Sequence, residues 1–233
     1  MEKNKLIATC ITAVAIIIAG AMIPCAVRTA KSYDRTVDVK GLCEKEVPAD
    51  KVIWSIGYKV AADDMSEVLR GIAADNRIIR EFLVNGGISE SEIGVSTPGI
   101  SDKYAQEYGS NDRYYRYLAS GVVTVATADV DKVLELANRQ SELLTKGVTL
   151  ENSYDSGLEF RYESLNEIKP QMIEEATANA REAALKFAKD SGSRIGKIKT
   201  ASQGTFSIDD RDSYTPYIKK VRVVTYVTYY LKH

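Results

Sequence analysis

The sequence predicts an α+β protein in which antiparallel or mixed β-sheets are covered by helices, preceded by one N-terminal transmembrane or signal helix. Three observations lead to this class. Segments of alternating apolar and polar residues come in adjacent pairs, as antiparallel strands do. Helix-period stripes that end at glycine separate them, in the order ββα-ββα-β-α-ββ. A long uncharged stretch also follows the first five residues. This order differs from the βαβ alternation of a doubly wound nucleotide-binding fold.

The uncharged stretch runs from Leu6 to Val27 and predicts a membrane segment or an export signal. A helix of this length spans about 33 Å, which is enough to cross a bilayer. Three interpretations stay open: an uncleaved signal anchor, a signal peptide cleaved near residues 19–21, and lipid attachment at Cys25. We therefore expect residues 1–27 to be this segment, 28–35 a linker, and 36–233 one folded domain outside the cytoplasm.

The first part of the domain predicts two strands and a helix. Residues 36–47 and 51–61 alternate as strands and are joined at residues 48–50, which favours a hairpin or close pair. One face of the second strand is apolar: Val52, Trp54, Ile56, Tyr58 and Val60. Asp63 and Asp64 open the helix, where negative charge is favourable. Its apolar stripe, which ends at the stop in residues 85–87, is Met65, Val68, Leu69, Ile72, Ile79, Phe82 and Leu83.

The second part predicts the same succession of elements. Residues 88–108 and 113–126 form a strand pair around a turn at 109–112. Asp129 is placed to cap a second helix that ends at residues 146–147. The apolar stripe of this helix is Val130, Val133, Leu134, Ala137 and Leu144.

The last part predicts a strand region at 148–162, a long helix, and a final strand pair at 197–208 and 217–231. We place the regular helix from about Pro170, because proline is best tolerated in a first turn, to a stop at Gly192. Its expected buried stripe is Ile173, Ala176, Ala180, Ala184, Phe187 and Ala188. The final strand alternates at Val221, Val223, Thr225, Val227, Tyr229 and Leu231. Alanine in the helix stripe lets the helix axis approach a sheet closely.

Composition excludes several classes of function. The formal net charge of -1 gives no support to a nucleic-acid or polybasic membrane partner. His233 is the only histidine, which excludes histidine triads and multi-histidine metal sites. The sequence contains no phosphate loop and indicates no cofactor. Asp209, Asp210 and Asp212 indicate a solvated hairpin tip or a hard-cation site, and Cys43 is either a small buried residue or a reactive or bridging thiol.

Tyrosines are concentrated in two hairpins, since 14 of the aromatic residues are Tyr against 4 Phe and 1 Trp. Two interpretations stay open: half-exposed strand residues, and a subunit interface, which tyrosine favours because it offers large contact area with a hydrated hydroxyl. The candidate interface residues are Tyr104, Tyr108, Tyr114, Tyr115, Tyr117, Tyr214 and Tyr217.

Several motifs resemble the SIMPL-domain family of exported bacterial proteins, which includes periplasmic and outer-membrane immunogenic antigens. They are the early strand 37–41 with residues 48–50 after it, the stretch from Leu165 to Ile208 with its alanine stripe and glycines, and the closing strand VRVVTYVTYYLK. The resemblance implies a location in the bacterial cell envelope, in the periplasm or anchored to the inner membrane. It also implies an α+β fold and, for some members, ring- or channel-like oligomers and a link to stress tolerance. It carries no catalytic residues over.

Three hypotheses of function follow. The first is a non-enzymatic, envelope-anchored protein that forms a homo-oligomer. The second is a periplasmic module that binds a small molecule or an envelope polymer. The third is a hydrolase that works without histidine.

Overall fold

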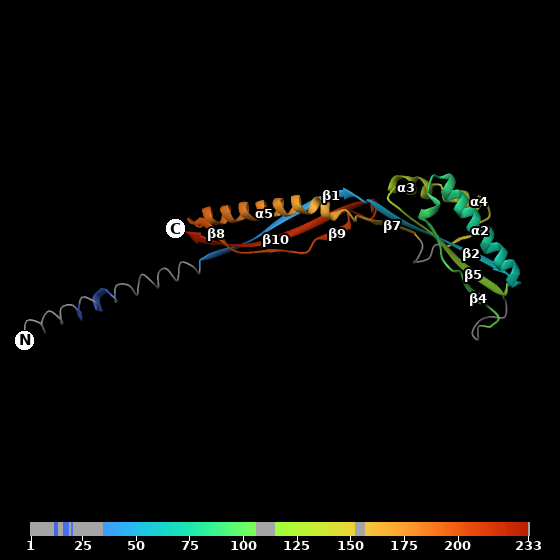
Figure 1. The fold of residues 1–233 in the computed structure, drawn as a ribbon, viewed down its shortest axis with the longest axis horizontal. Helices are drawn as coiled ribbons and strands as arrows, with labels where there is room; N and C mark the ends of the chain where they lie inside the picture. The colour runs from blue at the N-terminus through green and yellow to red at the C-terminus, as the bar shows by residue number, and fades with distance from the viewer. Residues whose placement is uncertain are drawn as a thin grey trace, which may run out of the picture. The chain divides into compact units, whose positions relative to one another are not determined.

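In the computed structural model, the described residues are 12–13, 16–18, 20, 35–105, 115–151 and 157–232. The chain divides into two compact units (Figure 1). Unit 1 comprises residues 1–45, 166–207 and 221–233, and unit 2 comprises residues 46–165 and 208–220. Each is described by itself.

One sheet of the protein is built on β10 (Ile218–Lys232), which lies between β1 (Thr36–Pro48) and β8 (Arg194–Gln203). A short strand, β9 (Ser207–Asp210), also pairs with β10. β8 and β10 are antiparallel, with register shifts after Thr228 and after Tyr229. The predicted alternation along β10 is confirmed: Val221, Val223, Thr225, Val227 and Tyr229 are buried, and the residues between them are half-buried or exposed.

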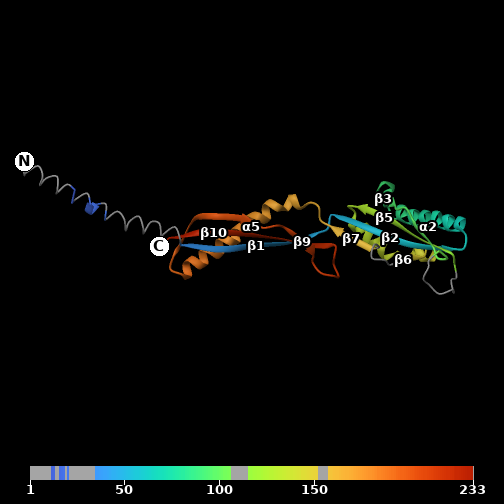
Figure 2. The same ribbon diagram turned by 90° about the horizontal axis from the view of Figure 1, so that it is seen from below.

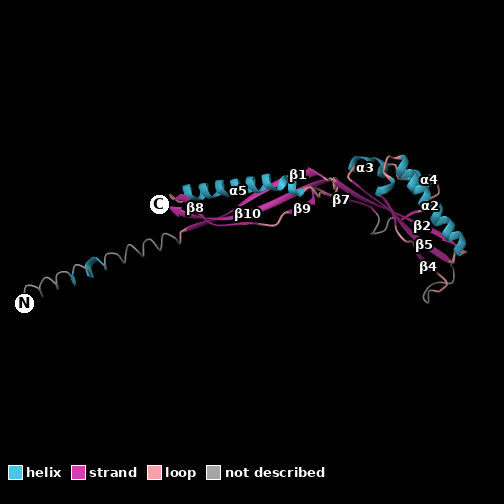
Figure 3. Ribbon diagram, viewed as in Figure 1, coloured by secondary structure: helices cyan, strands magenta, loops and turns pink. Residues whose placement is uncertain are grey.

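α5 (Leu165–Asp190) covers one face of this sheet in unit 1 (Figure 3). Its buried residues recur every fourth position: Met172, Ala176, Ala180, Ala184 and Ala188. Such a ridge drifts around a helix by about 40° per step, because four residues exceed one 3.6-residue turn. α5 accordingly crosses β1 and β10 obliquely (Figure 2).

Close packing of α5 on β1 depends on Gly41. A Cβ atom on Gly41 would lie 1.8 Å from the Ala176 carbonyl oxygen and 2.8 Å from the Ala180 Cβ. Cys43, two residues along, is buried and free, and burial together with a hydrogen bond to Glu175 raises the pKa of its thiol to about 11. The interpretation of Cys43 as a small buried strand residue is confirmed.

Two predictions for α5 were wrong. The helix begins at Leu165 and contains Pro170 within it, whereas we placed its regular start near Pro170. Phe187 was assigned to the buried stripe but is 61% exposed, and Met172 is buried in place of the half-buried Ile173. The 3,4 spacing fitted several stripes, and only the contacts with the sheet select the four-residue ridge.

Unit 2 is built on a sheet with the order β3-β5-β2-β6, all of whose pairs are antiparallel. Its strands are β2 (Lys51–Ala62), β3 (Ile93–Val95), β4 (Gly99–Asp102), β5 (Tyr117–Thr127), β6 (Leu150–Glu151) and β7 (Gly157–Arg161). β4 also pairs with β5, and β7 with β2. The predicted apolar face of β2 is confirmed, with Val52, Trp54, Ile56 and Tyr58 buried.

Helices α2 (Met65–Asn85), α3 (Val130–Asn138) and α4 (Ser141–Thr145) pack in unit 2, and η1 (Glu90–Glu92) is a short 3-10 turn. The predicted caps are confirmed: Asp64 accepts a hydrogen bond from the Ser66 amide, and Asp129 from the Lys132 amide. Leu144 was wrongly assigned to the stripe, since it is 56% exposed and Leu143 is buried. The break between α3 and α4 shifts the helical phase.

The prediction of an α+β protein with antiparallel sheets is confirmed. The predicted pairing of the first two strands is wrong, because β1 pairs with β10 while β2 pairs with β5, β6 and β7. The predicted N-terminal helix from Leu6 to Val27 lies mostly outside the described residues. Within the part of the chain that is described, no helix is both long and apolar enough to cross a membrane.

Candidate functional site

The tyrosines proposed as an interface take different positions in unit 2. Tyr214 is 92% exposed and Tyr104 is 60% exposed, so both rings are available for contacts. Tyr117 and Tyr217 instead pack partly buried against the core, and Tyr115 is half-buried. Tyr108 and Tyr114 lie outside the described residues.

Arg116 organises the exposed ring of Tyr104. Its guanidinium carbon lies 6.0 Å from the Tyr104 ring centre and 4.9 Å from that of Tyr117, and its Nη2 lies 3.1 Å from Asp102 Oδ2. The hydrogen bond to Asp102 raises the pKa of Arg116, and the same contact lowers the pKa of Asp102. This cluster fixes Tyr104 against β4 and β5.

The aspartates before Tyr214 have partners within their own turn. Asp212 accepts hydrogen bonds from the Thr215 hydroxyl and the amides of Tyr214 and Thr215, which with Arg211 lower its pKa to about 2. Asp210 forms an ion pair with Lys219. Among the described residues no group of three or more His, Cys, Asp and Glu side chains could hold a metal ion. Hydrogen bonds within the turn therefore account for the positions of Asp210 and Asp212.

Open cavities also lie among the described residues of unit 2. One, of about 420 Å³, lies beside α2 and includes Arg77 and Arg80 in its lining. Both arginines already have carboxylate partners, Glu81 and Glu90 respectively. Another, of about 480 Å³, includes Asp50, Lys51 and Glu163 in its lining. Its charged groups are also paired, since Lys51 Nζ lies 3.1 Å from Glu163 Oε1 and Asp50 accepts the Glu163 and Ser164 amides.

The free edge of β8 was missed by the sequence analysis. All of its residues are exposed except Ile195 and Gly196, and β10 is its one partner among the described strands. The Gly204 amide donates to the Val224 carbonyl at 2.8 Å, and the register pairs Gln203 with Thr225 and Ala201 with Val227. Because amides in an antiparallel strand point alternately to either side, those of Ala201 and Gln203 point away from β10.

This edge differs along its length. Residues Thr200 to Gln203 keep a regular register and carry no charge. The preceding part carries Arg194, Lys197 and Lys199 and faces the register shifts of β10. Charges and bulges are the devices by which proteins prevent an edge strand from pairing. The unprotected part of the edge is therefore residues 200–203, and no pattern within β8 could reveal which strand edges stay open.

The comparisons with known proteins identify the family. The model of the SIMPL family, described as a protein of unknown function (DUF541), matches residues 37–226. The chain belongs to the SIMPL family. No curated protein matches it. The predicted family resemblance is thus confirmed, and the match includes all of β8 and most of β1 and β10.

The charge of this SIMPL protein is divided between its units. Unit 2 has 23 Asp and Glu residues against 15 Lys and Arg, a formal net charge of -8. Unit 1 has 9 Asp and Glu residues against 16 Lys and Arg, a net charge of +7. The chain-wide value of -1 conceals this division of charge between the units.

Proposed function

We propose that this SIMPL protein is non-enzymatic, is held in the bacterial cell envelope, and assembles with copies of itself. The N-terminal segment anchors it to the inner membrane, or the protein is periplasmic where that segment is cleaved. The observation that carries self-assembly is the open edge of β8 at residues 200–203. The opposite edge strand of the same sheet, β1, also pairs with β10 alone among the described strands.

Two open edges in one sheet support pairing between copies. An exposed edge presents unpaired N–H and C=O groups, which another strand can satisfy. Each copy supplies both edges, β8 and β1, so a head-to-tail arrangement can add copies and close into a ring if the rotation permits. The exposed rings of Tyr104 and Tyr214 are candidate additional contacts.

The test is the mass of the full chain in detergent, measured by light scattering over a range of concentrations. We expect a mass above that of one chain. In Ala201→Pro, the ring of proline removes an amide that points away from β10, so the pairing of β8 with β10 is kept while the outer edge is blocked. We expect association to weaken roughly tenfold or more.

Ala201→Thr is the matched control, because it changes the side chain but keeps the amide. It should assemble like the wild type. A wild type that stays monomeric at every concentration, or an Ala201→Pro variant that assembles normally, would contradict the proposal.

A second candidate function is ligand binding at the cavity beside α2. The observation in its favour is the presence of Arg77, Arg80 and Asn76 around about 420 Å³ of open space. A ligand there would have to compete with Glu81 and Glu90 for the arginines. A thermal-shift screen of anionic envelope compounds tests it, since a ligand that binds only the folded state raises the unfolding temperature. The hypothesis would be contradicted if no compound raised the unfolding temperature of the wild type. It would also be contradicted if every such increase persisted in Arg80→Gln.

A further inference from the structure

Four stretches of unit 1 meet where the domain begins. The Arg35 guanidinium donates to the Ser193 hydroxyl at 3.1 Å, and the Leu231 amide donates to the Arg35 carbonyl at 2.8 Å. Ser193 follows α5, and its amide donates to the Ala188 carbonyl. Arg194, at the start of β8, lies opposite Lys232 at the end of β10. The start of β1 and the end of α5 therefore join the start of β8 and the end of β10 (Figure 1).

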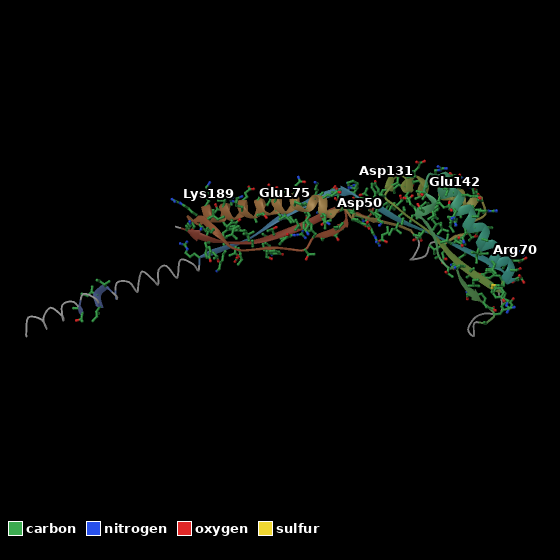
Figure 4. The ribbon with its side chains drawn as sticks, in the orientation of Figure 1. Asp50, Arg70, Asp131, Glu142, Glu175 and Lys189 are labelled. Atoms are coloured by element: carbon green, nitrogen blue, oxygen red, sulfur yellow. The ribbon has the colours of Figure 1, made fainter. Side chains whose placement is uncertain are left out.

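This place is rich in positive charge, and we call it the basic end. Residues 186–199 contain five basic side chains and one acidic side chain, Asp190. Figure 4 shows Lys189 near the end of α5, and Glu175 further back along the helix. The basic end comprises Arg35, Lys186, Lys189, Arg194, Lys197, Lys199 and Lys232.

The stretches that form the basic end also expose large apolar side chains. Phe187 is 61% exposed, Ile198 is 50% exposed and Leu185 is 46% exposed. Lys199 Nζ also lies 5.7 Å from the centre of the Tyr230 ring. Lysine and arginine beside exposed aromatic and aliphatic groups are typical of surfaces that lie in the headgroup region of a bilayer.

The chain itself keeps the basic end close to the apolar N-terminal segment. Val27 ends the uncharged stretch, and Arg35 lies eight residues later. Even a fully extended chain spans at most about 3.5 Å per residue, or about 28 Å over this interval. If the segment is in a membrane, the basic end is the part of the described domain that is tethered nearest to it.

We propose that the basic end of unit 1 binds the anionic headgroups of a phospholipid bilayer, with Phe187 inserted at the interface. Lysines in the last turns of α5 also offset the helix dipole. That role does not extend to Lys197 and Lys199 of β8 or to the exposure of Phe187. The inference rests on the membrane anchor included in the proposed function, and it adds a contact between the folded domain and the lipid.

The experiment places the photoreactive residue p-benzoylphenylalanine at position 187 of the full chain. The protein is reconstituted into nanodiscs of phosphatidylcholine alone or with about 30% phosphatidylglycerol. After illumination, mass spectrometry counts protein molecules that carry a lipid. The same photoreactive residue at Tyr214, an exposed position of acidic unit 2, is the matched site control.

We expect lipid adducts at position 187 to increase several-fold with phosphatidylglycerol, and to fall at about 1 M salt. The double variant Lys197→Gln with Lys199→Gln should reduce them roughly five- to thirtyfold. Arg70→Gln with Lys146→Gln makes the same change of charge in unit 2, at an exposed arginine outside both cavities, and should leave them unchanged. Position 214 should give few adducts in either lipid.

Three results would overturn the proposal. The first is equal labelling of position 187 in both lipids, in a protein that co-purifies with the nanodiscs; this result would leave the anchor intact. The second is cross-linking of position 187 to another copy of the chain in place of lipid, which would assign the basic end to self-assembly. The third is failure to co-purify with either nanodisc, which would reject the anchor as well.

Discussion

The two units bury their cores by different means. Unit 2 fills space with large side chains of its sheet and of α2, among them Trp54, Ile56, Tyr58, Ile79 and Leu83. Unit 1 buries alanines of α5 against a sheet and brings the helix backbone to within contact of Gly41. Substitutions that shorten core side chains are therefore expected to destabilise unit 2 most. Substitutions that enlarge side chains are expected to destabilise unit 1 most.

The two units also differ in their charged residues. Carboxylates of unit 2 with a lowered pKa are held by hydrogen bonds or basic neighbours, and they are Asp50, Asp64, Asp102, Asp129, Glu142, Glu159 and Asp212. Unit 1 instead has an excess of lysine and arginine. Low pH should thus destabilise unit 2 before unit 1. Salt should weaken the binding of anionic partners to unit 1.

The largest effect should come from adding a single methyl group to unit 1. In Gly41→Ala the new Cβ meets backbone atoms of Ala176 and Ala180, which cannot move without shifting α5. We expect the free energy of unfolding of unit 1 to fall by about 3 kcal/mol. Urea titrations followed by amide hydrogen exchange would show earlier loss of protection in α5 than in α2.

Gly121→Ala is the matched variant in unit 2. Its Cβ would meet the Tyr58 ring, at 2.3 Å from the hydroxyl oxygen and 2.4 Å from Cζ, and that hydroxyl donates a hydrogen bond to Asn76 Oδ1 at 2.8 Å. The Tyr58 side chain can tilt if it gives up this hydrogen bond. We therefore expect Gly121→Ala to lower the free energy of unfolding by about 1–2 kcal/mol. Equal losses for the two variants would show that unit 1 is not packed more tightly than unit 2.

A smaller effect, dependent on pH, should come from Asp50→Asn in unit 2. Burial raises the pKa of Asp50, but hydrogen bonds from Ser164 and the Glu163 amide outweigh it, so the pKa lies below its ordinary value of 3.8. A carboxylate with a lowered pKa stabilises the fold above its unfolded pKa, and this stability is lost as pH falls through the folded value. We expect Asp50→Asn to cost about 1–2 kcal/mol at neutral pH.

The pH profile separates this explanation from a packing effect. The difference between wild type and Asp50→Asn in the free energy of unfolding should shrink below about pH 4, where the wild-type carboxyl becomes protonated. Denaturant titrations at several pH values measure it. A constant difference from neutral to acid pH would mean that the charge of Asp50 contributes nothing.

Local features of the fold could be predicted from the sequence, and long-range ones could not. The caps at Asp64 and Asp129 and the glycine that ends α2 depend on neighbouring residues, so they were found. The pairing of β1 with β10 joins chain segments far apart, and the adjacent β2 offered a nearer partner. The positions of Phe187 and Leu144 depend on which side of a helix meets the sheet.

The candidate sites show the same limit. The tyrosines were visible as a composition bias, but only the structure distinguishes the exposed Tyr214 from the half-buried Tyr217. The open edge at residues 200–203 exists because nothing pairs beyond β8 among the described strands. The basic end is assembled from the ends of four stretches of unit 1. Neither the open edge nor the basic end can therefore be predicted from a single segment of the sequence.

The smallest effect on stability should come from Tyr214, and it tests whether unit 2 contributes to assembly. Its ring is 92% exposed, so we expect Tyr214→Ala to change the free energy of unfolding by less than about 0.5 kcal/mol. Tyr217→Ala should cost about 2 kcal/mol, because the Tyr217 ring packs edge-on against Phe160 with centroids 6.1 Å apart. Light scattering of Tyr214→Ala then decides its role. A reduced mass without a loss of stability would place this hairpin in the interface between copies, while an unchanged mass would leave the contacts to the strand edges of unit 1.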